Sequence, residues 1–254
     1  MRTISRRLLL LLAAIFALTF FAPTLKHNQA YAEKPYEDVP IDQIHSIYWK
    51  CKTMHDITVT IEQTGEERKI ESGTTFTCTY YSLYSTCSGM LHDGSKFKLS
   101  KDDFYTIENM CTPGDFKKST KEAYVNSRKL KSKTKYLIWV STDRQSLTVF
   151  TGKNRHWKVL KVFPCSTGMA QYATPLGVKK LGYKKELLIS EQWGGKLNWF
   201  CSFGGSGIHS WPNGGNGGHY MGRVPCSHAC VRLRQRHAKW VYKHIPKGTT
   251  ILIY

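Results

Sequence analysis

The segment VPCSHACVRL, residues 224–233, combines residue types that suit nucleophilic chemistry. Cys226 and Cys230 are four positions apart, His228 lies between them, and Arg232 follows. A cysteine attacks as its thiolate, so positive neighbours and a nearby base favour this reaction. We expect a helix to begin soon after Cys230. The free N–H groups at a helix start favour a thiolate and could stabilise the oxyanion that forms during acyl transfer. Cys230 is therefore the candidate nucleophile.

Three histidines are candidates for the general base. His209 follows a short apolar and glycine step in GIHS, where a strand end would hold the imidazole in place. His219 lies in the middle of a glycine-rich loop, which is a poorer place for defined geometry, and His228 is beside the cysteine.

Other interpretations of these residues remain open at this point. Cysteine and histidine are zinc ligands, but a C-x3-C spacing is unusual for zinc and no second pair follows. A disulfide would pair Cys226 or Cys230 with Cys165 or Cys201, and a buried structural cysteine is a further alternative. All eight cysteines lie after residue 50, and an oxidising compartment favours pairing of most of them. We expect Cys226 to pair with a residue other than Cys230, while the full connectivity cannot be deduced from spacing.

A mostly β domain must position these residues. The runs 136–141, 146–152 and 157–166 are rich in β-branched and aromatic residues and predict a β-meander. Residues 204–222 hold many glycines and predict a loop without regular structure. Apolar residues at helical spacing predict one helix over 234–245, and a final strand follows over 249–254.

The preceding part of the chain reads as a separate β module. Period-2 alternation over 56–62, 73–80 and 94–100 predicts short antiparallel strands. We expect a small β-rich accessory module of the SH3-like kind over 33–120. The polar, lysine-rich residues 121–134 are predicted to be a basic linker to the domain 135–254.

The first 32 residues have the layout of a signal peptide. Arginines precede the apolar run 8–21, and the small-x-small step Ala30–Ala32 follows. The chain has a formal charge of +19, and removal of this leader, which holds four Lys and Arg and no acid, leaves +15. Such a charge favours polyanionic partners. We expect export to the periplasm or cell wall, with anionic wall polymers as partners and no nucleic acid.

The segment IHSWPNGGNGGHYMGRVPCSHACVRL resembles the active-site signature of bacterial L,D-transpeptidases with a YkuD-type catalytic domain. The segments YLIWVSTDRQSLTVFTG, with Gln145 in its turn, and CSTGMAQYATPLG resemble further segments of that family. One departure is Ala229, where glycine is usual. Because alanine disfavours positive φ, we expect an ordinary backbone conformation there.

The resemblance implies a role for each matching residue. Cys230 would be the nucleophile and His209 its base, and the main-chain carbonyl of Ser210 would orient the imidazole. The implied substrate-binding residues are Ser227, His228, Arg232 and Trp199. His228 would line the acyl pocket, Arg232 would steady the motif or bind a carboxylate, and a flap over 182–200 would cover the site with Trp193, Trp199 and Phe200.

The resemblance also implies the fold and the reaction. The fold would be an L,D-transpeptidase-type β-sandwich with one helix after the nucleophile. The enzyme would form a thioester with a peptidoglycan stem peptide and transfer it to an amine, cross-linking the wall, without metal or organic cofactor. A carbapenem would acylate the cysteine. The alternatives are an L,D-carboxypeptidase or other peptidoglycan hydrolase, transfer to a protein amine, and an inactive wall-binding module.

Overall fold

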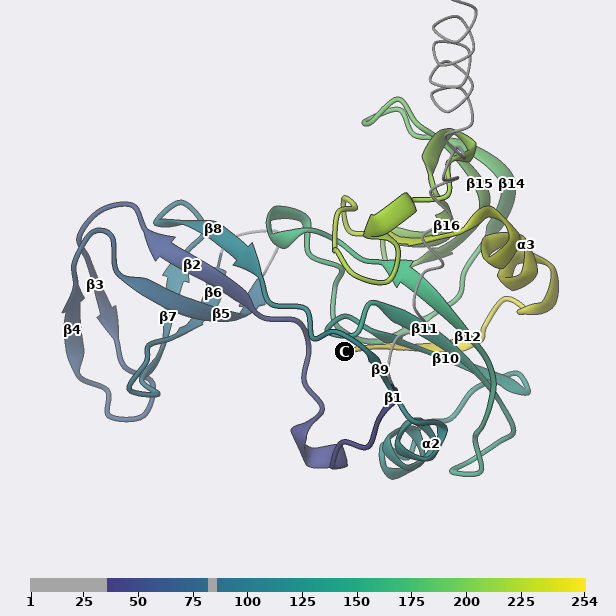
Figure 1. Cartoon of the computed structure of the whole chain (residues 1–254), viewed down its shortest axis with the longest axis horizontal. Coiled ribbons are helices and arrows are strands. Elements are labelled where there is room, and N and C mark those ends of the chain that lie inside the picture. Colours follow the sequence, from purple (N-terminus) through teal and green to yellow (C-terminus); the bar gives the residue numbers. More distant parts are fainter. Residues whose placement is uncertain (1–35, 82–85) are drawn as a thin grey trace, which may run out of the picture. The chain divides into compact units, whose positions relative to one another are not determined.

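The computed structural model describes residues 36–81 and 86–254 of the chain (Figure 1). The predicted signal peptide, residues 1–32, lies outside the described residues. Residues from Pro35 onward belong to one compact unit. No helix within the described ranges is long and apolar enough to cross a membrane.

Nine hydrogen-bonded strands build the part of the chain that carries the candidate site. Their order across the sheet is β13 (Gly177–Lys180), β18 (Thr250–Ile253), β10 (Tyr136–Ser141), β11 (Ser146–Thr151), β12 (Lys158–Ser166), β17 (Val231–Leu233), β16 (Ser206–Ser210), β15 (Lys196–Phe203) and β14 (Lys184–Ile189). The predicted meander and the final strand are confirmed, and the prediction of a mostly β fold is confirmed with them.

Helix α3 (Gln235–His244) covers the core of this sheet. Its Ala238 and Val241 are fully buried among apolar side chains of β10, β11, β15 and β16, including Ile208 and Phe203. The i, i+3 spacing that predicted this helix produces the buried stripe. Burial of that stripe fixes the helix beside the strands that hold His209 and Cys230.

A second helix, α2 (Lys118–Ser127), occupies much of the predicted linker, so that prediction is wrong. Tyr124 and Val125 are buried in a cluster with Trp139 on the opposite side of β10. Lys121, also buried, donates to Asp115 Oδ2 at 2.6 Å and to Thr148 Oγ1 at 3.0 Å. A lysine at a core position hides the helical pattern in the sequence, because burying its ammonium needs a partner carboxylate that sequence does not reveal.

The N-terminal part forms the β sheets that its alternation predicted. Five strands pair in the order β7 (Lys96–Ser100), β6 (Thr86–Met90), β5 (Thr75–Tyr81), β2 (Trp49–Thr53) and β8 (Phe104–Asn109). A hairpin of β3 (Ile57–Thr60) and β4 (Glu67–Ile70) adds to them, and β1 (Tyr36–Glu37) pairs with β9 (Asp115–Phe116). A Cys78–Cys87 disulfide links β5 and β6. The SH3-like type of this module stays a prediction.

Two local predictions near the motif are wrong. The glycine-rich stretch contains a regular strand, β16, whose five residues are all buried. Strand β17 separates Cys230 from α3, so the thiol does not lie at the start of that helix. Both segments are short and are held by pairing with neighbouring strands, which local composition does not encode.

Candidate active site

The register of two short parallel strands brings the motif together. Ile208 of β16 pairs with Val231 of β17, and His209 pairs with Arg232. Ile208 and Val231 are both fully buried in the core beneath α3. Because side chains alternate along a strand, His209 and Arg232 point to the opposite face. Cys230 lies in a bend directly before β17, and its sulfur has a hydrogen bond from the backbone of Gly207, two residues before His209. The cysteine and the imidazole therefore both lie next to β16.

The imidazole of His209 is held in one tautomer. Its Nδ1 lies 2.6 Å from the carbonyl oxygen of Ser210, which can only accept, so Nδ1 carries the hydrogen and Nε2 has a free lone pair. The residue is 2% exposed. Burial lowers the pKa of His209 to about 4, and Arg232 lowers it further while the bond to Ser210 opposes the shift. The neutral imidazole is therefore ready to accept a proton at Nε2.

The thiol of Cys230 is neutral at rest. Burial raises its pKa, and this effect outweighs the hydrogen bond from the backbone of Gly207 and the charge of Arg232, which both lower it. The basic setting therefore does not produce a resting thiolate. A thiol that is neutral at rest can act as a nucleophile only if a base takes its proton as the sulfur attacks.

The loop before the nucleophile is tied to a neighbouring segment. Ser227 Oγ donates to the Cys230 carbonyl, closing the corner. The Ser227 N–H donates to Thr167 O and the Met169 N–H donates to Ser227 O, both at 3.0 Å. Segment 167–169 therefore fixes the position of the cysteine corner.

Ala229 has a φ of +74°, so our expectation of ordinary backbone conformation there is wrong. The tight corner between Ser227 and Cys230 requires the left-handed region, which costs a non-glycine residue roughly 1–2 kcal/mol. The surrounding hydrogen bonds hold alanine in this conformation.

Arg232 braces the motif through its own chain. Its Nη1 donates to the Cys226 carbonyl at 2.9 Å, and its Cζ lies 5.2 Å from the centre of the Trp211 ring. Its Nε is buried without a hydrogen-bond partner. The guanidinium is therefore held by the Cys226 carbonyl and the Trp211 ring, with one buried donor left unpaired.

His228 forms a cluster of three rings with Trp193 and Tyr172. The Trp193 ring stacks on the imidazole at 3.7 Å between centroids and 8° between planes. Tyr172 meets His228 edge-on at 4.9 Å and Trp193 at 5.4 Å. Burial and the charge of Arg232 lower the pKa of His228. Trp193, from the turn between β14 and β15, thereby covers the histidine next to the nucleophile.

Trp199 is separated from the other candidate residues. It packs on the α3 side of the sheet, where its ring meets Tyr242 at 5.4 Å and Lys239 Nζ at 4.8 Å. The next residue, Phe200, faces the site instead and stacks 6.0 Å from His209. Of the predicted flap aromatics, Trp193 and Phe200 contact site histidines, and Trp199 contacts the helix.

Gln145 is a positioning residue whose role sequence reasoning missed. It is fully buried in the β10–β11 turn, with Nε2 donating to Thr167 Oγ1 at 2.7 Å and Oε1 accepting from the Thr167 N–H at 2.9 Å. Through Thr167 it supports Ser227. The sequence gives no separate signal for this role, because the neighbouring turn residues are also polar, and the burial and positive φ of Gln145 appear only in the structure.

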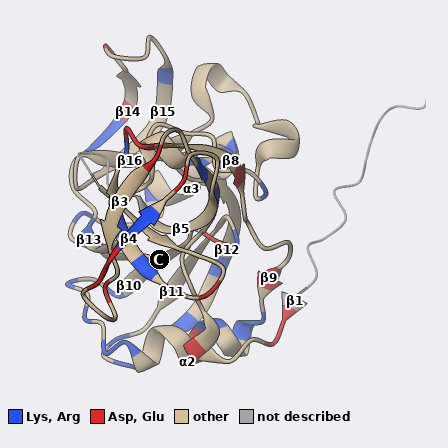
Figure 2. Ribbon diagram, turned by 90° about the vertical axis from the view of Figure 1, so that its left-hand side faces the viewer, with Lys and Arg blue, Asp and Glu red and all other residues tan. Residues whose placement is uncertain are grey.

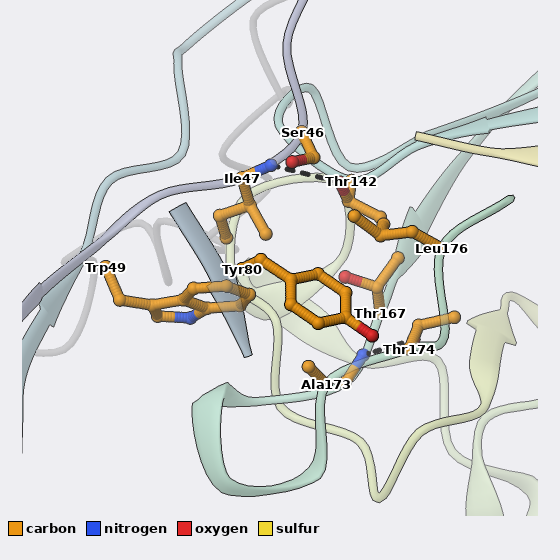
Figure 3. Close-up of a pocket in the computed structure, with 10 residues that line it drawn as sticks. Ser46, Ile47, Trp49, Tyr80, Thr142, Thr167, Ala173, Thr174 and Leu176 are labelled. Carbon is orange, nitrogen blue, oxygen red and sulfur yellow. Dashed lines mark hydrogen bonds between the residues drawn. The ribbon is translucent and has the colours of Figure 1, made fainter. Parts of the chain in front are cut away.

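A small cavity lies behind the same segment (Figure 3). Thr167, Ala173 and Thr174 line one side of it, and Ile47 and Trp49 of the β module line the other. The dashed lines mark the bonds from the Ile47 N–H to Thr142 Oγ1 and from the Gly168 N–H to Thr174 Oγ1. The cavity does not contain the nucleophile and instead backs the segment that supports it.

The remaining cysteine predictions have mixed outcomes. The thiols of Cys51, Cys201, Cys226 and Cys230 are free. Because these four of the eight thiols are free, the expectation that most cysteines pair is not met, and the prediction that Cys226 pairs is wrong. Cys226 Sγ lies 3.1 Å from Ser166 Oγ. Across residues 36–81 and 86–254, no group of three or more His, Cys, Asp or Glu is placed to hold a metal ion.

Comparison with known proteins identifies this part of the chain. Residues 135–253 match the model of the YkuD family, described as the L,D-transpeptidase catalytic domain. No relative was found among curated proteins.

Several solved structures resemble the chain. One is a Clostridium acetobutylicum protein described as a fused Zn-dependent amidase/peptidase/peptidoglycan-binding domain-containing protein. It is 28% identical over an alignment that covers 54% of this chain and 59% of that protein, with a TM-score of 0.47. An L,D-transpeptidase from Stackebrandtia nassauensis is 24% identical over 54% of this chain and 67% of its own, with a TM-score of 0.40. The L,D-transpeptidase LdtMt1, solved with imipenem, is 14% identical over 80% and 78%, with a TM-score of 0.42. This chain thus spans 59% of the length of the first of these proteins, which is less than two thirds.

The family match covers β10 to β18, and therefore includes His209, Cys230 and every strand that positions them. Residues 135–253 of this chain, a little under half of it, thus match the catalytic domain of the L,D-transpeptidase family.

Proposed function

We propose that the protein is an exported cysteine L,D-transpeptidase that cross-links peptidoglycan. The observation that carries this proposal is the register of β16 and β17, which pairs His209 with Arg232, two residues after Cys230, within the residues that match the family's catalytic domain. The predicted signal peptide and the positive charge support export to an anionic wall.

The reaction begins with attack of the Cys230 sulfur on the carbonyl after the L-centre of a stem-peptide diamino acid. The Nε2 of His209 accepts the thiol proton as the sulfur–carbon bond forms, and Ser210 stabilises the imidazolium through its carbonyl. Collapse of the intermediate breaks the peptide bond, and the imidazolium proton leaves with the amine of the terminal D-residue. The product is a thioester on Cys230.

A side-chain amine of a neighbouring stem peptide then attacks the thioester. His209 takes a proton from this amine and returns it to the departing sulfur, so the thiol is regenerated and a new amide joins two third-position residues. The Trp193 and Tyr172 rings beside His228 limit the access of water to the thioester. Arg232 would steady the motif through its bond to the Cys226 carbonyl.

Acylation of the mature chain by a carbapenem tests the nucleophile. Intact mass without reductant is expected to show one adduct on the wild-type protein and none on Cys230→Ala. Because the resting thiol is neutral, His209→Gln should slow adduct formation by roughly 100-fold or more. An adduct that persists in Cys230→Ala would remove the proposal, and absence of any adduct on a folded wild-type protein would favour an inactive wall-binding domain.

Product analysis decides between transfer and hydrolysis. A tetrapeptide stem incubated with a D-amino acid or a stem amine should give the new amide in excess of the hydrolysed tripeptide. A tripeptide alone would instead indicate an L,D-carboxypeptidase with the same nucleophile and base.

A further inference from the structure

The positive charge is confined to the catalytic domain. Residues 135–254 contain 18 Lys and Arg against three acids, a charge of +15, whereas residues 33–134 contain 15 of each and are neutral. Of the three acids, Asp143 is buried. The two parts of the chain therefore differ in net charge. Solubility does not require that the positive charge be concentrated in one of them.

The short segment 131–135, which leads into this domain, carries three lysines, two of which precede residue 135 and are counted with the neutral part. Lys131, Lys133 and Lys135 are exposed, whereas Ser132 and Thr134 between them are half-buried. Ser132 Oγ accepts from the Thr250 N–H at 3.1 Å, and Thr134 Oγ1 lies 2.8 Å from Thr249 Oγ1. We call Lys131, Lys133 and Lys135 the lysine strip.

The backbone of the strip is pinned as well. The Lys131 carbonyl accepts from Thr250 Oγ1 at 2.8 Å, and the Lys135 carbonyl accepts from the Gly152 N–H at 3.0 Å. Thr250 begins β18 and Gly152 directly follows β11, so both contacts are to the ends of interior strands of the catalytic sheet. The strip is therefore an anchored segment, bent at residues 133–135, whose inward hydroxyls fix it and whose outward lysines face solvent.

Further cations flank the strip. Lys153 and Arg155 are exposed in the turn that begins at Gly152, next to Lys135. Lys247 is exposed beside Gly248, whose added Cβ would lie 3.9 Å from Lys133 Cβ. In Figure 2, Lys and Arg recur along the loops near β10 and α2.

These cations have no acidic partners. Between Glu122 and Glu186 the only acid is the buried Asp143, and Glu122 already binds Lys158 at 3.0 Å. Within the described ranges, no salt bridge involves the strip or its three flanking cations, and Lys135 Nζ instead lies 5.4 Å from the Tyr136 ring. Their charge is thus uncompensated by the protein and available to a ligand.

We propose that the lysine strip binds a linear polymer of phosphodiester-linked polyols in the cell wall. The three lysines project from one pinned segment beside Lys153, Arg155 and Lys247, so the cluster can meet several successive charges of a linear polyanion. A lipid surface is the poorer fit, because membrane-surface binding adds buried apolar side chains and the strip exposes none. The inference does not rest on acyl transfer, and a Cys230→Ala chain should bind equally well.

The test compares two triple variants of the mature chain with equal charge. One replaces the strip, as Lys131→Gln, Lys133→Gln and Lys135→Gln. The matched control removes three exposed lysines of the β module, as Lys50→Gln, Lys96→Gln and Lys101→Gln. Binding is measured to isolated walls that carry phosphodiester polymers, to the same walls after these polymers are removed by hydrofluoric acid, and to long-chain inorganic polyphosphate.

The strip variant should raise the Kd for intact walls and for polyphosphate on the order of tenfold and reduce its salt dependence, while the control changes it less than twofold. A Lys→Arg triple variant of the strip should restore binding. Equal losses of affinity in both Gln variants would show that binding depends on net charge alone. If the wild-type chain bound stripped walls as tightly as intact walls, the phosphodiester polymer would be excluded as the ligand. Stronger binding to phosphatidylglycerol vesicles than to walls would also overturn the proposal. Thermal unfolding checks that each variant folds.

Discussion

At the scale of single residues, the site depends on two neutral groups. Burial raises the pKa of Cys230 and lowers the pKa of His209 to about 4, so neither carries charge at neutral pH. Because the reacting form has both groups neutral, we expect the rate of carbapenem acylation to be constant through the neutral range and to fall as pH decreases to about 4, where His209 takes up a proton. Mass spectrometry at timed intervals gives this profile, and a rate that rises steadily across the neutral range would indicate attack by a small thiolate fraction instead.

The same burial of His209 makes stability depend on pH. The unfolded histidine binds a proton below its ordinary pKa near 6.5, whereas the folded one does so only near 4. Stability from this group is therefore fully present above pH 6.5 and is lost as pH decreases to about 4, by on the order of 3 kcal/mol. Denaturant unfolding at pH 7 and pH 4 measures the loss. His209→Gln, which cannot titrate, should lose less stability over this interval than the wild type, and an identical loss would contradict the prediction.

Ala229 stores strain that glycine would remove. With φ at +74°, Ala229→Gly should increase the free energy of unfolding by about 1 kcal/mol without loss of acylation. The control is Ala238→Gly in α3, where the buried helical position should make the same replacement destabilising. A destabilised Ala229→Gly protein would show that the methyl group contributes packing that outweighs the strain.

At the scale of elements, one buried glutamine connects the β10–β11 turn to the cysteine corner. Gln145→Ala should leave the Thr167 N–H without a partner, cost about 2–3 kcal/mol and slow carbapenem acylation, because Thr167 supports Ser227. The matched control is Gln63→Ala, since exposed Gln63 also bonds two backbone groups, Gly94 O and the Lys96 N–H. An acylation rate unchanged by Gln145→Ala would show that the corner is held without this link.

Elements with their own periodicity could be predicted, and elements held by their neighbours could not. The strands at 136–141 and 146–151 and the helix at 235–244 bury alternate or helically spaced apolar residues, which the sequence displays directly. Strand β16 lies among glycines, and α2 has Lys121 at a core position. Their stability comes from pairing and from a buried ion pair, both of which depend on residues distant in sequence.

The candidate site shows the same division. The motif order identified His209 and Cys230, and the contact of His209 with the Ser210 carbonyl is present in the structure. The face that a side chain occupies was not predictable for Trp199, because its positive φ of 58° and its contact with α3 follow from packing. The assigned roles of these residues stay predictions until acylation is measured.

At the scale of the whole molecule, the β module and the catalytic domain share a hydrophobic cluster. Ala170 and Ala173 of the catalytic domain are buried in the cluster that contains Ile47 and Trp49 of the module. The same short stretch carries Tyr172, whose ring contacts His228. Packing of the module is therefore continuous with one wall of the site.

This continuity predicts an effect of the module on catalysis. Ala173→Asp places a charge in the apolar cluster that also contains Ile47 and Trp49. Because an unpaired buried charge is unfavourable, the change should loosen segment 167–174 and slow carbapenem acylation about tenfold. The control Ala123→Asp lies on the exposed side of α2 and should leave the rate unchanged. Circular dichroism confirms that both proteins fold. Because Cys230 and His209 are untouched in either variant, a slower rate in Ala173→Asp alone assigns the module a part in holding the site, and equal rates would limit it to tethering.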